Sequence, residues 1–480
     1  MKLAIQLRGL LLFLTSFLEI AVPFVRTLII SHLLVPYEFG FASALAVTSA
    51  TFSQITDIAI SSFVVSSPRS VYSEALAGAH ALAIVRGFLV CGLVLLACKP
   101  VACSFGVCSA WSSFAWLAPV MIISSFEHFE IRVAASRDYH YWPALVATAL
   151  SNGVGLAALF LITYKFENHS GFIVYLLVQS SIYVLASHLL ASSLYRADYR
   201  SQFLRKAFWF GLPLILNGIG LAIMSQGDRW IVGGFLGLPF LGLYAVVTLA
   251  GYVPLIGLLR IIGPIVFGGL HHANVESGEF DTRLKLYSRA VPVIAAVYAL
   301  GLMALYDFVV PAVFGPRYVI SEAAVVILAT ITFVRIVRND PQTCLLFHAQ
   351  KTHQLAVVGQ APFVGLLVTT GLAIVHPTLE FVLIGTLVGE IAGLCSISYV
   401  SRRLLNSAIY DHAISVLAMG SIVVAAGVLL LSMPDSEGFA TRIAVVVGVL
   451  TLVVAFAGVS LPGLYWKAYG ARGEQVRAAT

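Results

Sequence analysis

Residues 76–98 read LAGAHALAIVRGFLVCGLVLLAC, and Arg86 is the only Asp, Glu, Lys or Arg among them. A helix needs about 20 apolar residues to cross the hydrocarbon core of a bilayer. The apolar residues here form one continuous run, whereas the strands of an outer-membrane barrel alternate apolar and polar positions. This stretch therefore predicts a membrane-spanning helix with one charge inside it.

The composition of the whole chain has the same character. Of its 480 residues, 60% are apolar and only 10% are charged, whereas a soluble domain carries about 25% charged residues. A soluble fold of this length cannot bury so much apolar surface, because its exterior must be largely polar. The composition thus predicts an all-α polytopic membrane protein and excludes the soluble, disordered, coiled-coil and disulfide-scaffold classes.

Fourteen apolar stretches of spanning length follow one another along the chain, with ends defined to about 2–4 residues. They cover residues 9–32, 40–65, 76–98, 113–134, 143–163, 171–194, 207–228, 235–266, 288–312, 319–338, 354–375, 379–400, 412–432 and 440–462. The first is too long and too charged for a cleaved signal peptide. Because the connections are short and leave no room for a soluble domain, we expect the function to lie inside the helix bundle.

Lys and Arg side chains gather on one side of this predicted bundle. With the N-terminus inside, the inner loops and tails hold 20 of the 28 basic residues and the outer loops hold five. Cytoplasmic loops of membrane proteins carry such an excess. We therefore expect cytoplasmic N- and C-termini and an even number of spans.

A weak internal repeat relates two parts of the chain. Shifting the sequence by 202 residues lays Arg26–Phe41 over Asp228–Leu243, so that Gly40 falls on Gly242 and Pro36 lies next to Pro239. Transporters are often built from such repeats. The repeat predicts a six-helix bundle in residues 1–200, a second in residues 201–405, and two further helices with a cytoplasmic tail in residues 406–480.

Charged residues within the spans are functional candidates, because a charge at membrane depth costs about 2.5–3.5 kcal/mol on insertion scales. Arg26 is followed by Asp57 in the first half, and Asp228 is followed by Arg260 in the second. One interpretation is a cavity in which Arg26 and Arg260 bind an anion and the acids couple an ion or balance charge. The alternative is two structural salt bridges, Arg26–Asp57 and Asp228–Arg260.

Five further residues complete the candidate site. We expect Arg86 to line the cavity or to neutralise an acid, and Glu19 and Glu390 to couple an ion or to act as buried structural carboxylates. Asn217 and Gln360 are candidates for hydrogen bonds to sugar hydroxyls.

Several other kinds of site are not expected. The formal net charge is +6, but no basic run exceeds two residues, so we expect no nucleic-acid partner. The chain has no Walker-type phosphate loop. Glu127, His128, Glu130 and Arg132 are better explained as an interfacial polar network than as metal ligands. Cys103 and Cys108 share a predicted outer loop and are either a disulfide or two free thiols.

Four short segments resemble one known family. They are Pro36-Tyr-Glu-Phe-Gly40, Arg137-Asp138-Tyr139, Phe210-Gly-Leu-Pro213 with Asp228 beyond it, and Phe314-Gly-Pro-Arg-Tyr318. In this order, they resemble the polysaccharide flippase (Wzx-like) family of the multidrug/oligosaccharidyl-lipid/polysaccharide exporter superfamily. The resemblance extends over the whole chain.

The resemblance implies a transporter and not an enzyme, without cofactor or metal, in the bacterial inner membrane. Its substrate would be an oligosaccharide on undecaprenyl pyrophosphate, moved to the outer leaflet by alternating access driven by an ion gradient or the membrane potential. The implied partners are that lipid, the bilayer, a polysaccharide polymerase and chain-length proteins. In the related lipid II flippases, arginines on the first and eighth helices are assigned to the pyrophosphate, and Arg26 and Arg260 occupy those helices here.

Three other functions are alternatives to the flippase. A drug or cation antiporter of the same superfamily would favour acids and aromatic residues over paired arginines. A membrane polysaccharide polymerase needs a large outer loop, which the chain lacks. A lipid II flippase proper would carry more charge along the first span. The sequence names neither the sugar nor the coupling ion.

Overall fold

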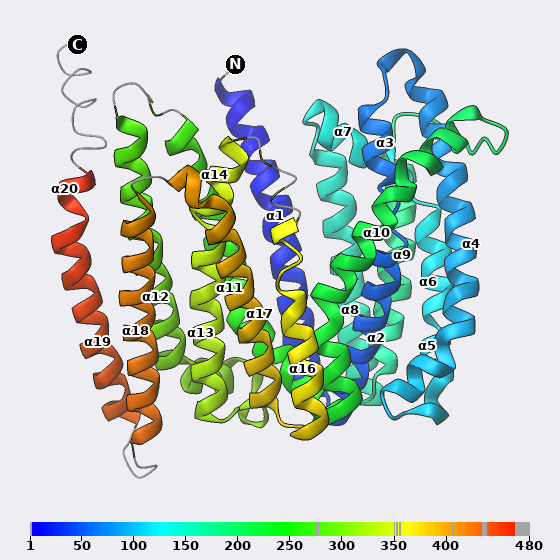
Figure 1. Cartoon of the computed structure of the whole chain (residues 1–480). Coiled ribbons are helices and arrows are strands. Elements are labelled where there is room, and N and C mark those ends of the chain that lie inside the picture. Colours follow the sequence, from blue (N-terminus) through cyan, green and yellow to red (C-terminus); the bar gives the residue numbers. More distant parts are fainter. Residues whose placement is uncertain are drawn as a thin grey trace. The chain divides into compact units, whose positions relative to one another are not determined.

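The computed structural model describes residues 2–271, 273, 278–349, 351, 354, 357–405, 408–433 and 439–465. These residues form helices joined by turns, and no β-strand occurs among them (Figure 1). The all-α prediction is therefore confirmed. The chain divides into two compact units, Met1–Val246 and Val247–Thr480. The predicted three-part division at residues 200 and 405 stays a prediction.

Unit 1 contains ten helices and the start of an eleventh. They are α1 (Lys2–Leu33), α2 (Pro36–Ile55), α3 (Ile60–Ser66), α4 (Tyr72–Ser104), α5 (Trp111–Ala115), α6 (Leu117–Ser125), α7 (Glu130–Asp138), α8 (Trp142–Phe166), α9 (Ser170–Leu190), α10 (Gln202–Ile231) and the first residues of α11 (Leu238–His271). Within this unit α4 packs against α6 and α10, and α10 also packs against α2.

Unit 2 contains the rest of α11 and eight helices in the described part of the chain. They are α12 (Glu279–Phe314), α13 (Glu322–Asn339), α14 (Gln342–His348), α16 (Phe363–Val375), α17 (Leu379–Leu405), α18 (Ala408–Ser432), α19 (Phe439–Ser460) and α20 (Pro462–Tyr465). Here α12 packs against α13, α18 and α19, and α13 packs against α17.

Each of the fourteen predicted stretches overlaps a helix of the structure. Among the described residues, nine helices are long and apolar enough to cross a membrane, or ten if the bent helix α10 counts as one span. The chain is therefore a multi-pass membrane protein, and the count of fourteen spans stays a prediction.

Some stretches that were predicted as continuous are broken in the structure, namely 40–65, 113–134 and, at the turn of residues 359–362, 354–375. The stretch 40–65 ends its first helix at Ile55 and resumes at Ile60. The Asp57 carboxylate accepts a hydrogen bond from the Ala59 N–H at 2.9 Å, and Ala59 has a left-handed backbone with φ of 46°. A short acidic side chain that captures a nearby backbone N–H competes with the helix for that donor. The stretch 113–134 is broken in the same way, between Ser125 and Glu130.

The two repeat-related helix starts contact each other inside unit 1. Helices α2 and α11 begin at Pro36 and Leu238, which lie 202 residues apart, the offset of the predicted repeat. A Cβ atom on Gly40 would lie 1.8 Å from the Leu238 carbonyl oxygen, and one on Gly242 would lie 3.0 Å from the Gly40 nitrogen. The two backbones approach this closely only because both positions are glycine.

We expect a Gly40→Ala substitution to destabilise the protein by about 1–3 kcal/mol or more, since the added methyl overlaps backbone that cannot move alone. The matched control is Gly92→Ala in α4, where a Cβ meets no atom within 4 Å. Thermal unfolding of both purified variants measures the difference. Equal unfolding midpoints for the two variants would show that the contact is not tight.

Cys103, in the last turn of α4, forms a disulfide with Cys108, just beyond the end of that helix. Of the two possibilities left by the sequence, the structure therefore selects the bonded pair.

Candidate functional site

A polar cavity of about 500 Å³ lies within unit 1. Its wall is built from the end of α2, the α2–α3 break with the start of α3, α4, α6, and the α6–α7 break with the start of α7. The lining residues are Ser53, Gln54, Asp57, Ala59, Ile60, Ser61, Ser62, Ala83, Arg86, Gly87, Val90, Met121, Ser124, Ser125, Glu127, Phe129 and Arg132. The volume falls within the range of about 300–1,000 Å³ that is usual for small-molecule sites. Both helix breaks contribute charged side chains to this wall.

Arg86 projects into the cavity from the middle of α4, about 20 Å along that helix at 1.5 Å per residue. Its Nη2 donates to the Ser53 carbonyl oxygen at 3.2 Å and to the Thr56 hydroxyl at 3.1 Å. Its Nε is buried and has no hydrogen-bond partner. In the described part of the chain Arg86 forms no ion pair within 4.0 Å, and its hydrogen-bond partners are neutral groups. Such an arrangement is costly and typical of a functional residue.

Glu127 and Arg132 form an ion pair across the α6–α7 break. The Arg132 Nε lies 2.8 Å from Glu127 Oε1, and the Tyr183 hydroxyl donates to the same oxygen at 3.3 Å. Burial raises the pKa of Glu127, while Arg132 and Tyr183 oppose that shift. Burial alone would lower the pKa of Arg132, but the Glu127 charge outweighs it and raises the pKa. Burial therefore outweighs the ion pair at Glu127, whereas the ion pair outweighs burial at Arg132.

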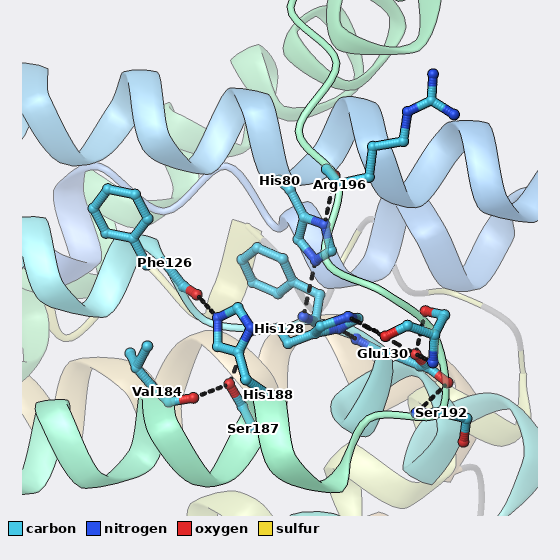
Figure 2. A network of polar contacts seen from close by, with 11 residues as sticks. His80, Phe126, His128, Glu130, Val184, Ser187, His188, Ser192 and Arg196 are labelled. Carbon is cyan, nitrogen blue, oxygen red and sulfur yellow. Dashed lines mark hydrogen bonds and ion pairs between the residues drawn. The ribbon is translucent and has the colours of Figure 1, made fainter.

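A second polar network lies directly behind this wall, on the other side of residues 127–130. His80, His128 and His188 surround the ring of Tyr195, with centroid distances to Tyr195 of 4.3, 5.6 and 4.7 Å. Glu130 accepts from the Ser193 N–H at 2.9 Å and from the Ser192 N–H at 3.2 Å (Figure 2). Glu127 and Phe129 thus face the cavity, whereas His128 and Glu130 face this network.

Both nitrogens of His80 and His128 are used in this network (Figure 2). His80 Nε2 accepts from the Phe129 N–H at 3.3 Å, and its Nδ1 faces the Arg196 carbonyl oxygen at 3.0 Å. His128 Nδ1 accepts from the Glu130 N–H at 3.4 Å, and its Nε2 faces the Ser193 carbonyl oxygen at 3.1 Å. Each imidazole therefore donates once and accepts once, which only the neutral ring can do.

We expect acid to loosen this network. Burial lowers the pKa of His128 below its ordinary value, so the stabilisation is complete above about pH 6.5 and is lost as the pH falls below that. Burial alone would raise the pKa of Glu130, but hydrogen bonds from Ser193 and Ser192 outweigh it and lower the pKa. That contribution is also lost on acidification, below about pH 4.3.

Hydrogen exchange of the backbone amides in residues 126–130 and 191–196 measures this effect. Exchange should accelerate from pH 7 to about pH 4 after correction for the intrinsic pH dependence of exchange. A His140→Gln variant is the control, because His140 is exposed. Corrected rates that do not change with pH would contradict the expectation.

The structure places Arg26 away from its predicted partner. The Arg26 guanidinium lies over the rings of Phe172 and Tyr175, 5.4 and 5.7 Å from their centroids. Within the described residues Arg26 and Asp57 form no ion pair, so the structural salt bridge offered as an alternative is wrong for this pair. Asp57 instead lines the cavity together with Arg86.

The remaining predicted residues of unit 1 lie elsewhere. Asp228 accepts from the Tyr244 hydroxyl at 2.5 Å and from the Arg229 N–H at 2.8 Å. Glu19 and Asn217 lie in α1 and α10, but their side chains are outside the described part of the structure. Asp228 is not among the described residues that line the cavity.

In unit 2, Glu390 is buried between two arginines of α13. Its Oε1 lies 2.8 Å from Arg335 Nε, and its Oε2 lies 3.1 Å from Arg338 Nε. The Arg335 guanidinium also lies 4.1 Å from the centroid of the Tyr252 ring. Arg260 is exposed on α11, and Gln360 is exposed in the turn before α16. A coupling role for Glu390 stays a prediction.

The sequence did not assign Arg132, Glu127, Arg335 or Arg338 to a site. Arg335 and Arg338 are three residues apart, so they share one helix face, and this spacing was a usable signal. Glu127 and Arg132 are five residues apart and would diverge by about 140° on a continuous helix. Only the break in the chain brings them together. No group of three or more His, Cys, Asp or Glu in the described ranges is arranged to hold a metal ion.

Comparisons with known proteins agree with this architecture. The model of the family described as "Polysaccharide biosynthesis protein" matches residues 29–323. No curated protein sequence matches the chain. The solved structure of the lipid II flippase MurJ, in an inward closed conformation, is similar with a TM-score of 0.59 and 14% identity, over 94% of this chain and 98% of that one.

Two transporter structures are similar as well. A multidrug resistance MATE family transporter of the MOP superfamily, in an inward-facing conformation, gives a TM-score of 0.58 and 14% identity over 83% of this chain and 96% of that one. The eukaryotic MATE transporter AtDTX14 gives 0.52 and 15% identity over 85% and 97%. At these identities the likenesses concern the fold. Since the family model covers well over half of the chain, this protein belongs to the polysaccharide biosynthesis protein family, and its fold is that of the MOP superfamily.

Proposed function

We propose that this protein is a flippase in the bacterial inner membrane. It moves oligosaccharide repeat units on undecaprenyl pyrophosphate from the inner to the outer leaflet, for a surface polysaccharide such as O-antigen or an exopolysaccharide. The movement is alternating access, coupled to an ion gradient or the membrane potential, and involves no enzymatic step. The observation that carries the proposal is the polar cavity of unit 1, with Arg86 about 20 Å along an apolar helix.

The physics of the task explains why such a cavity is needed. A sugar head group with its pyrophosphate cannot cross hydrocarbon without replacing the water that it loses. Side chains that offer donors and acceptors inside the bundle supply that replacement. The polyprenyl tail is apolar and can remain in the bilayer while the head group passes.

Arg26 and Arg260 stay candidates for recognition of the pyrophosphate, each within its own unit. Arginine offers a planar fork of donors that matches phosphate oxygens. Arg26 is half-buried, and its described contacts are the two aromatic rings of α9. Asp57, Asp228, Glu19 and Glu390 stay candidates for ion coupling or charge balance.

The test is deletion of the gene, followed by mass spectrometry of the lipid-linked glycans and by labelling of those that face outside. We expect repeat units to accumulate facing the cytoplasm, and wild-type protein to restore their export. Arg26→Ala and Arg260→Ala proteins should fail to restore it. Arg317→Ala, which removes an exposed arginine in the turn after α12, is the control and should restore export.

Other outcomes point elsewhere. Rescue by both arginine variants would keep the flippase and remove these two arginines from the site. Single units that reach the outer face but fail to polymerise would indicate a polymerase. Unchanged lipid-linked glycans together with altered sensitivity to cationic compounds would indicate an antiporter and overturn the proposal.

A further inference from the structure

We propose that the cavity of unit 1 is a binding subsite for an uncharged sugar residue of the transported glycan, and not a pyrophosphate site. Arg86 and Arg132 donate to the sugar hydroxyls, and Asp57 and Glu127 accept from them. The inference rests on the proposed function, because it names the part of the substrate that this cavity holds.

First, positive and negative charges balance in the cavity wall. The lining contains two guanidinium groups and two carboxylates, with no other Asp, Glu, Lys or Arg. A pyrophosphate would be attracted by the two arginines and repelled by the two acids. A hydroxyl group can donate to a carboxylate and accept from a guanidinium at the same time. A wall of balanced charge therefore favours a neutral, hydroxyl-rich ligand over a doubly charged one.

Second, several donors and acceptors in the described cavity wall have no hydrogen-bond partner in the protein. Glu127 uses Oε1 for its protein partners, and Asp57 uses Oδ1 for the Ala59 N–H. Arg132 uses only Nε toward the protein. In the described structure, Oε2 of Glu127, Oδ2 of Asp57 and both terminal nitrogens of Arg132 therefore have no protein partner. Acceptors and donors are thus both open, as a sugar requires and a phosphate does not.

The other wall residues suit the same ligand. Serine hydroxyls come from three helices: Ser53 in α2, Ser61 and Ser62 in α3, and Ser124 and Ser125 in α6. Between them lie apolar groups such as Met121 and Phe129, which can pack against the C–H faces of a sugar ring. The total volume of about 500 Å³ leaves room for a ring with its substituents.

The histidine network holds the acidic side of this subsite in place. The backbone N–H of His128 donates to the Ser187 hydroxyl at 2.9 Å, and His188 Nε2 lies 2.9 Å from the Phe126 carbonyl oxygen (Figure 2). These bonds fix both ends of the turn that carries Glu127. A binding group must be held by its surroundings before the ligand arrives if it is to bind selectively.

The test measures protection of a cysteine placed in the wall. In a background without Cys91 and Cys395, Ser124→Cys reports on the cavity, because Ser124 is an exposed lining residue. The control reporter is His140→Cys in the same background, because His140 is exposed in the turn between α7 and α8. Purified protein in nanodiscs is treated with a polar maleimide, alone or with neutral hexoses, N-acetylhexosamines or inorganic pyrophosphate at millimolar concentration.

We expect at least one neutral sugar to slow labelling of Ser124→Cys, pyrophosphate to leave it unchanged, and neither to affect labelling of His140→Cys. Arg132→Lys keeps the charge beside Glu127 but loses the fork. Asp57→Asn keeps the turn, because an amide oxygen can accept the same Ala59 bond. Each should raise the sugar concentration for half-protection about tenfold.

Protection by pyrophosphate but not by any sugar would overturn the inference, as would no protection by either. The export assay of the preceding subsection separates the two proposals. If deletion makes the glycolipid accumulate facing the cytoplasm, but no sugar protects Ser124→Cys from labelling, the proposed flippase is supported and the proposed sugar subsite is wrong. If a sugar protects the cavity but deletion leaves lipid-linked glycans unchanged, the cavity is a sugar-binding site, but the flippase and the assignment of that sugar to a transported glycan are both wrong.

Discussion

A Glu390→Gln variant is expected to lose about 3–5 kcal/mol of its free energy of unfolding, because the substitution removes the buried negative charge that lies between two arginines. Glu390 is only 4% exposed, and its two oxygens lie 2.8 and 3.1 Å from Arg335 and Arg338. Glutamine is the same size and can still accept hydrogen bonds. The loss therefore measures the charge and not the volume of the side chain.

Thermal unfolding of the purified protein would show the loss as a fall in midpoint on the order of 10 °C. The matched control is Glu380→Gln, in the first turn of the same helix, where the carboxylate accepts from Ser321 at the surface. That variant should unfold within about 0.5 kcal/mol of wild type. A second change, Arg338→Gln in the Glu390→Gln background, should restore part of the stability.

A different outcome would change the role of Glu390. If Glu390→Gln unfolds like wild type but no longer supports export, the stabilising role is wrong. The coupling role predicted from the sequence would then gain support, because the charge would matter for transport and not for folding.

An Arg86→Met variant should lose export while keeping or increasing its stability. The arginine has no ion-pair partner among the described residues, and its Nε is buried without a hydrogen bond. A methionine of similar length removes this buried cation and fills the space with apolar atoms. A hydrogen bond from a charged donor contributes about 1.5–3 kcal/mol, so its loss should reduce export about 10- to 100-fold.

The export assay and the unfolding midpoint must be measured on the same preparation of Arg86→Met protein. The control is Arg69→Met, which removes a surface arginine that pairs with Asp138 in the same unit. It should retain both export and stability. If Arg86→Met unfolds at a lower temperature in proportion to its loss of export, Arg86 would be a structural residue, and the functional role would be wrong.

The sequence predicted the helices well because spanning length is a local property. A run such as 76–98 has to form helix in lipid, where each backbone N–H and C=O must be bonded within its own segment. The two helix starts that the offset of 202 residues matches also contact each other, at Gly40 and Leu238, although the repeat itself predicted no contact.

The cavity could not be predicted to the same extent, because it depends on where helices stop. Arg86 and Asp57 were recognised as charges at membrane depth, and they do line one cavity. Their partners in the wall, Glu127 and Arg132, meet only after the chain breaks between α6 and α7. That break is stabilised by contacts with distant residues such as Ser187, which no local pattern reveals. The two partners of Glu390, Arg335 and Arg338, lie on a different helix, α13, so the sequence around Glu390 did not identify them.

Residues 127–130 belong to two structures at once, since alternate side chains face the cavity and the histidine network. Thermodynamic reciprocity then links ligand and proton. If protonation of His128 lowers the affinity of the cavity for a ligand by some factor, the bound ligand lowers the affinity of His128 for a proton by the same factor. A molecule bound in the cavity would therefore shift the acid transition of the network to lower pH. Through the four-residue turn, the affinity of the cavity for its ligand would in turn depend on the pH of the adjoining water.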